Sequence, residues 1–240
     1  MQRFYIPAEM DGRSMFGGSA GLRLEPGAAV SVPPSERGKS VAGTGHILAA
    51  DLEPEALFAG RWPVRLFLAS SDEGNLGASG GGEHVFAFWE MQVIAEVQAW
   101  RALGPNGLEA AEFVEAASKL SPAQAEALEA EFEIRKDGLG EIQRHAGGLL
   151  RAANRSRAHL SAAMAARPPG EYRLQYPTFH VAMALIGRDL LTPEMFNVLT
   201  RPWTESIGRT WAAEQSLGAK LIGGTWSSPV AGWTASMELM

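Results

Sequence analysis

Hydrophobic and polar residues alternate in the first part of the chain in the way that β-strands require. Short apolar runs at 3–6, 21–24 and 28–32 are separated by glycine and proline, and residues 63–69 alternate apolar side chains along a longer run. A period of two predicts strands with one buried face, and the glycine and proline between them predict turns. We therefore expect a small, mostly antiparallel sheet at the N-terminus.

A change in hydrophobic spacing near residue 84 predicts a helix. Large apolar residues recur at three- and four-residue steps from Phe86 through Trp89 and Val93 to Trp100. That spacing places the side chains on one face of a helix over residues 84–103. A helix so rich in large apolar groups must be packed, and the N-terminal strands are the nearest surface.

Three more helices are expected in the middle of the chain, at 108–120, 122–134 and 139–166. Glutamates dominate the first two and arginines the third, with a turn between the acidic and basic parts. Our preferred interpretation is an antiparallel hairpin that sets the glutamates beside the arginines. The alternative is an anion-binding stripe on the third helix. Its members, spaced by seven and four residues, are Arg144, Arg151 and Arg155.

Capping residues mark the expected starts of two helices. Ser121 is followed by Pro122 and Gln124, which is the spacing of a capping box with proline at the first helical position. The triplet Thr-Pro-Glu at 192–194 offers a hydroxyl cap, a proline and a carboxylate in the first turn. Pro202 is expected to interrupt the helix that starts there.

Together these patterns predict the α+β class and three parts of the chain. Residues 1–83 form the β-rich part, residues 84–167 a helical part packed on it, and residues 168–240 the C-terminal helices with an extended tail. The tail carries Trp226 and Trp233. Two tryptophans in a tail indicate that it docks on this chain or on another, so we predict that both bind a partner.

Composition and charge limit the classes of protein that the chain can represent. Its 240 residues include no cysteine and carry a net charge of −6. Disulfides and thiolate metal sites are therefore excluded, and nucleic acid binding is disfavoured. The N-terminus lacks the charged and apolar regions of a secretory signal, and no window approaches ~18 apolar residues. We expect a soluble, cytoplasmic protein that does not enter a membrane.

Two histidines are candidates for ligand binding. His46 follows Gly45 in a turn where small residues let a ligand approach closely, although a structural histidine is the preferred interpretation. His84 lies at the expected start of a helix. No second histidine lies at metal-ligand spacing from either, so we expect no metal and no cofactor. The glycine-rich stretch at 77–82 lacks the lysine of a nucleoside-triphosphate loop, and a flexible linker is preferred.

Short motifs in the first half of the chain are similar to uncharacterised proteins of actinobacteria and their phages. These motifs are Asp11-Gly12 with Gly17-Gly18, Gly45-His46 followed by Asp51-Leu52, the strand region 62–68, and Val97-Gln98-Ala99-Trp100 with Phe113. The resemblance implies a phage- or defence-associated protein and implies no activity. The turn, short helix and strand at 43–69 also resemble the ADP-ribosyltransferase-like layout, whose catalytic residues find no match in this sequence.

No stretch combines catalytic residue types at a spacing that demands one chemistry. We therefore expect a non-catalytic binding or assembly protein that associates with a protein partner or with itself. The alternative, implied by the second resemblance, is a nucleotide-utilising enzyme with His46 and the glycine-rich stretch at its site.

Overall fold

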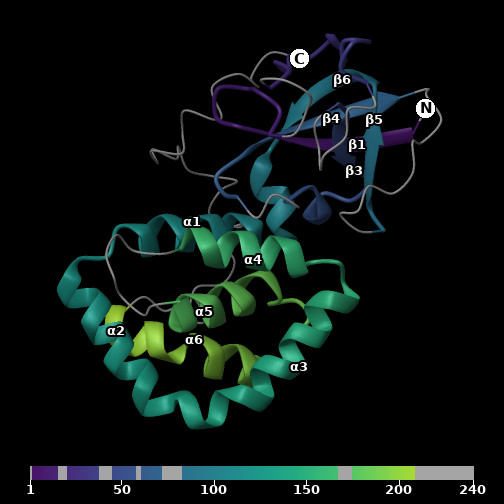
Figure 1. Ribbon diagram of the computed structural model, residues 1–240. Coiled ribbons are helices and arrows are strands. Elements are labelled where there is room, and N and C mark those ends of the chain that lie inside the picture. Colours follow the sequence, from purple (N-terminus) through teal and green to yellow (C-terminus); the bar gives the residue numbers. More distant parts are fainter. Residues whose placement is uncertain are drawn as a thin grey trace, which may run out of the picture. The chain divides into compact units, whose positions relative to one another are not determined.

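The computed structural model describes residues 2–15, 21–37, 45–57, 61–71, 83–166 and 175–208. The chain divides into a compact unit, Met1–Ile207, and a second unit, Gly208–Met240. Within the described part of the first unit, a six-stranded sheet is followed by helices α1 to α6 (Figure 1). The predicted α+β class is confirmed.

The sheet is antiparallel throughout its described pairs, as the alternating pattern predicts. Its order is β2-β6-β4-β1-β3-β5, so the N-terminal strand β1 lies inside the sheet between β4 and β3. The strands are β1 (Gln2–Ala8), β2 (Ala29–Ser31), β3 (Ile47–Ala50), β4 (Arg65–Ser71), β5 (Val85–Phe88) and β6 (Glu90–Val97).

One face of the sheet is closed by a cluster of large buried side chains. Phe4 on β1, Phe67 on β4 and Phe88 on β5 belong to it, with Met91 and Val93 on β6. The rings of Phe4 and Phe88 lie 4.6 Å apart between centroids, within the range of favourable aromatic pairs. The strand expected at residues 63–69 is present, but its single buried face is wrong, because Leu66 and Phe67 are both fully buried and only Phe67 belongs to this cluster, together with Ala69.

The predicted helix over 84–103 is wrong, because these residues form β5, β6 and a short 3-10 helix, η2 (Ala99–Leu103). Met91 and Val93 are buried while Gln92 and Ile94 are exposed, which is a period of two. A register shift in the β4–β6 pairing, between Leu68 and Ala69, interrupts that alternation and leaves a spacing that resembles a helix. Residues 84–97 are therefore strands because β6 pairs with β4 and β5 pairs with β3.

The helices predicted near 108–120 and 122–134 are confirmed as α1 (Gly107–Ser118) and α2 (Pro122–Arg135). The hydroxyl of Ser121 accepts a hydrogen bond from the Gln124 backbone N–H at 3.3 Å. The Gln124 side-chain oxygen accepts one from the Ser121 N–H at 3.0 Å. The capping box is therefore formed as expected.

The single long helix expected at 139–166 is two helices, α3 (Leu139–Ala152) and α4 (Ser156–Ala165). Asn154 lies between them with φ 56°, in the left-handed region that asparagine tolerates. The Arg155 N–H donates to Leu150 O at 2.8 Å and the Asn154 N–H donates to Arg151 O at 3.1 Å. This pair of bonds is a Schellman motif, which ends α3 and turns the chain into α4.

The last two described helices are α5 (Gln175–Ile186) and α6 (Pro193–Ile207). Thr192 Oγ1 accepts a bond from the Met195 N–H at 3.2 Å, which confirms the predicted start. The expected interruption at Pro202 is wrong, because α6 continues through it. Trp203 is fully buried with its ring edge-on to Phe113 at 5.0 Å, and this packing offsets the ~3 kcal/mol cost of a proline inside a helix.

The helices are joined to the sheet through the connection between β3 and β4. A short 3-10 helix in this connection, η1 (Pro54–Leu57), carries Glu55, which pairs with Arg157 of α4 at 2.5 Å. Just before η1, Glu53 pairs with Arg101 of η2 at 2.7 Å. The Ser161 hydroxyl of α4 donates to the backbone oxygen of Arg61 at 2.7 Å. The contacts of Arg157 and Ser161 fix α4 against the sheet connection, and the contact of Arg101 fixes η2 there.

Candidate functional site

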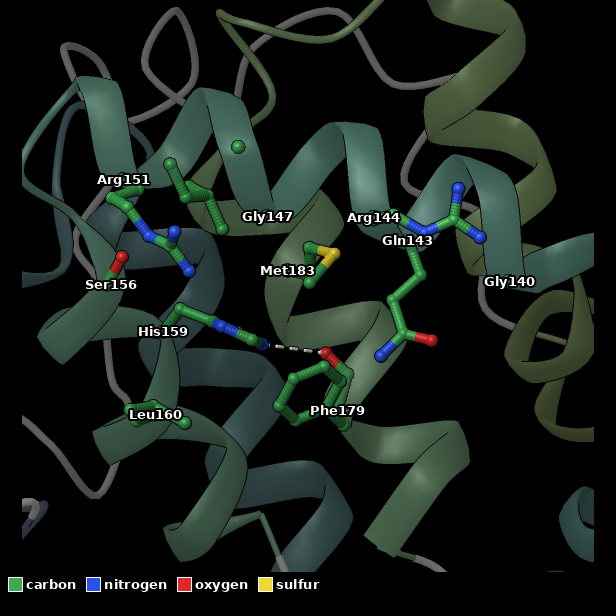
Figure 2. Close-up of a pocket in the computed structure, with 12 residues that line it drawn as sticks. Gly140, Gln143, Arg144, Gly147, Arg151, Ser156, His159, Leu160, Phe179 and Met183 are labelled. Atoms are coloured by element: carbon green, nitrogen blue, oxygen red, sulfur yellow. Dashed lines mark hydrogen bonds between the residues drawn. The ribbon is translucent and has the colours of Figure 1, made fainter.

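A pocket of about 540 Å³ opens where α3, α4 and α5 meet (Figure 2). Gly147 and Gly148 of α3 line the pocket with backbone atoms alone, so no side chain projects into it from the middle of that helix. A Cβ atom at Gly147 would lie 3.9 Å from the Met183 methyl group of α5, in ordinary contact. The turn at Asn154 brings α4 beside α3 and thereby closes one end of the pocket.

Arg144 and Arg151 line the pocket, and both side chains are exposed. Neither forms an ion pair within the described residues. Other arginines of the helices do have acidic partners in that part of the chain. They are Arg135 with Glu131, Arg155 with Asp189, Arg157 with Glu55, Arg188 with Glu109 and Arg201 with Glu205. Two cationic groups that have no carboxylate partner in the described part of the chain therefore open onto one cavity.

Of the predicted set of three arginines, Arg155 does not line this pocket with Arg144 and Arg151. Arg155 turns away to Asp189, whose carboxylate accepts from both guanidinium nitrogens at 2.5 and 2.9 Å, and it also donates to Ile186 O at 3.2 Å. This bidentate bond lowers the pKa of Asp189. The preferred pairing of the arginines with the glutamates of 109–133 is wrong, since Glu109, for example, binds Arg188 and no described ion pair joins Arg144, Arg151 or Arg155 to that segment.

His159 of α4 forms part of the pocket wall and is 4% exposed. Its Nε2 donates to the backbone oxygen of Phe179 at 3.2 Å, and the two rings meet edge-on at 4.2 Å (Figure 2). Burial lowers the pKa of His159 to about 4, and nearby His180 adds to the effect. The imidazole is therefore neutral near pH 7, a weak base, and its Nε2 proton is already engaged.

Neutral hydrogen-bonding groups lie at both ends of the pocket. Gln143 of α3 accepts a bond from Nε2 of His180 through its Oε1 at 3.3 Å, which leaves its amide nitrogen available to donate. Ser156, the first residue of α4, lines the opposite end near Arg151. A neutral donor therefore accompanies a charged one at the Arg151 end, whereas the Gln143 amide turns toward α5.

The two histidines singled out from the sequence do not form one site. Ile47 pairs with Phe88 and Ala50 with Val85, so His46 and His84 lie at opposite ends of the β3–β5 pair. The His46 ring stacks on Trp89 at 6.3 Å, and the preceding residue, Gly45, is buried with φ 98°.

His84 precedes a strand, so its expected place at a helix start is wrong. Its Nδ1 lies 3.0 Å from the Asp51 carboxylate. Neither His46 nor His84 lines the pocket between α3, α4 and α5.

Other sequence candidates lie outside the described residues. Trp226 and Trp233 of the tail and the glycine-rich stretch at 77–82 belong to this group, so their proposed roles stay predictions. Within the ranges that the structure covers, no three histidine, aspartate or glutamate side chains gather closely enough to hold a metal ion. None of the described helices has the length and apolar character needed to cross a membrane.

Comparison with known proteins adds no relative, since no protein-family model, curated protein or solved structure matches this chain. The geometry of the pocket is therefore the basis for inferring function.

Sequence reasoning identified Arg144 and Arg151 but missed the residues that surround them. Gln143, His159, Phe179 and Met183 carry no motif, and they meet only because α3, α4 and α5 pack together. The one local signal that could have revealed the arrangement is Asn154, a residue type that favours the left-handed position after a helix.

Proposed function

We propose that this protein binds a small organic anion without transforming it, and that the pocket between α3, α4 and α5 is the binding site. The observation that carries this proposal is the pair Arg144 and Arg151. Both are exposed at the cavity and lack acidic partners among the described residues, whereas neighbouring arginines are paired. Guanidinium groups are well suited to phosphate and carboxylate, because their planar donors match both.

The size and polarity of the cavity support a small molecule. Ligand sites in proteins span roughly 300–1,000 Å³ and combine apolar walls with a few polar groups, which describes this pocket of about 540 Å³. Phe179 and Met183 supply apolar surface, and Arg144 and Arg151 supply charge. A phosphorylated compound with a hydrophobic or aromatic body, such as a nucleotide, fits this combination.

Binding is favoured over catalysis by the chemistry of the lining. No carboxylate belongs to the described lining, and the one imidazole, His159, is neutral with its Nε2 proton donated to a backbone carbonyl. General acid–base catalysis needs a group whose pKa lies near the working pH and whose proton can reach the substrate. The nucleotide-utilising enzyme suggested by the resemblance would require a different site.

A thermal-shift screen against nucleotides, sugar phosphates and dicarboxylates tests the proposal. A ligand at about a hundred times its dissociation constant should stabilise the protein by about 2.7 kcal/mol. Arg151→Gln should abolish the shift, and Arg201→Gln should preserve it, because Arg201 lies on α6 outside the lining.

Two outcomes of this screen contradict the proposal. The first is the absence of a shift with every compound. The second is a shift that survives Arg151→Gln and disappears in His46→Ala, which would move the site to the sheet and favour the nucleotide-utilising enzyme.

A further inference from the structure

Resting on the proposed function, we propose that the ligand carries two anionic groups about 10 Å apart, joined by an apolar middle, of which a terminal bisphosphate is the simplest form. Arg144 and Arg151 are seven residues apart on α3. A rise of about 1.5 Å per residue separates their backbones by about 10 Å along the helix, and two full turns return both to nearly the same face.

The two arginines belong to different ends of the pocket. Figure 2 shows Arg144 beside Gln143 toward the Gly140 end of α3, and Arg151 toward Ser156 and His159. The Ser156 hydroxyl lies beside the Arg151 side chain, whereas the Gln143 side chain turns toward α5 and away from the Arg144 guanidinium (Figure 2). Two separate anion positions account for this arrangement better than one position shared by both arginines.

The space between the two ends is apolar. The Met183 methyl group of α5 lies close to Gly147, Gly148 faces open space, and Phe179 of α5 adds an aromatic side chain to the lining. Leu160 of α4 also lines the cavity and is 49% exposed, so a ligand that covers it removes apolar surface from water. A single inorganic anion would leave this middle uncovered.

The charge of the molecule favours a small bis-anion over a nucleic acid. The chain has a net charge of −6, and acidic residues of α2 lie in the same helical part of the molecule. A polyanion that extends beyond the pocket would meet this negative potential, whereas a ligand confined to the cavity would not.

Calorimetric titration of the full chain with the bisphosphate of hexanediol and with hexyl monophosphate tests the inference. The bisphosphate should bind about tenfold more tightly or better, because a second charge-assisted contact forms only with it. Arg144→Gln and Arg151→Gln should each reduce bisphosphate affinity to the level of the monophosphate. Only one of these changes should weaken the monophosphate.

Two controls show whether a loss of affinity comes from the pocket arginines themselves. Arg144 and Arg151 are exposed and make no described ion pair, so both variants should melt as the wild type does. Arg201→Gln removes the same charge from α6 and should leave both affinities unchanged.

Each alternative result shows which of the two proposals fails. Equal affinity for the two compounds, lowered by both arginine changes, would mean one anion held jointly, which overturns the bis-anion and keeps anion binding. Failure of both compounds to bind overturns the bis-anion, and the nucleotide screen then decides separately on the pocket. Salt-sensitive RNA binding that both changes remove, without small-molecule binding, rejects both proposals.

Discussion

The buried imidazole of His159 should make the protein lose stability as the pH falls below neutrality. His159 is 4% exposed, and burial lowers its pKa from 6.5 to about 4. The groups that face it are the backbone oxygen of Phe179, which accepts its Nε2 proton, and the imidazole of His180, which repels a second positive charge. The charged form is therefore disfavoured in the folded state and unhindered in the unfolded chain.

This difference in pKa sets both the sign and the pH window of the effect. Between pH 6.5 and about 4 the unfolded state binds the proton and the folded state does not, so the free energy of unfolding falls as the pH falls. Relative to pH 8, the loss from His159 amounts to about 2 kcal/mol at pH 5 and about 3 kcal/mol at pH 4. Below pH 4 both states are protonated and the loss stops growing.

Urea denaturation between pH 8 and pH 5 measures this loss in wild type and in His159→Gln. The variant starts less stable because its packing is altered, but its stability should fall by about 2 kcal/mol less over that range. His145→Gln is the matched control, since His145 lies exposed on α3, and it should retain the wild-type slope. Equal slopes for wild type and His159→Gln would refute the reasoning.

The remaining predictions concern stability, measured by urea denaturation at pH 7. Gly107→Ala should cost about 3 kcal/mol or more, because a Cβ there would lie 1.8 Å from Trp100 O. In Gly148→Ala the new methyl group enters open space on a helix, so the free energy of unfolding should rise by about 1 kcal/mol. A Gly107→Ala variant more stable than Gly148→Ala would contradict the close packing at α1. Trp203→Ala should cost about 3–5 kcal/mol, and a loss below about 1 kcal/mol would show that its burial is not needed. Arg155→Gln should cost about 1 kcal/mol at pH 7, and less once the pH falls below the lowered pKa of its carboxylate partner, Asp189; a variant as stable as wild type at pH 7 would show the pair to be dispensable.

Local sequence patterns such as helix caps were reliable, because the interactions that they predict join residues only a few positions apart. The capping box at Ser121 and Gln124 and the hydroxyl cap at Thr192 formed as predicted. Their donors and acceptors are three residues apart, so the backbone of a single turn brings them together. The strand character of β1 and β4 was also predictable, but which side chains of β4 face the core was not, because Leu66 and Phe67 are buried on opposite faces.

Spacing misled where a distant segment decides the local structure. Residues 84–103 carry a helical spacing, yet β6 pairs with β4 and β5 pairs with β3. Those pairs join residues about 20 to 40 positions apart, and no local propensity records them. Pro202 was misread for the same reason, since the burial of Trp203 against Phe113 keeps α6 helical through it.

The sequence alone determined that Arg144 and Arg151 share a helix face, because a spacing of seven residues is two turns of any α-helix. Only the tertiary structure separated Arg155 from them, by supplying Asp189 from a turn 34 residues away. It also placed Phe179 against His159, 20 residues earlier in the chain. Helix periodicity fixes which residues of one helix lie together, whereas a pocket wall built from α3, α4 and α5 depends on how the three helices pack.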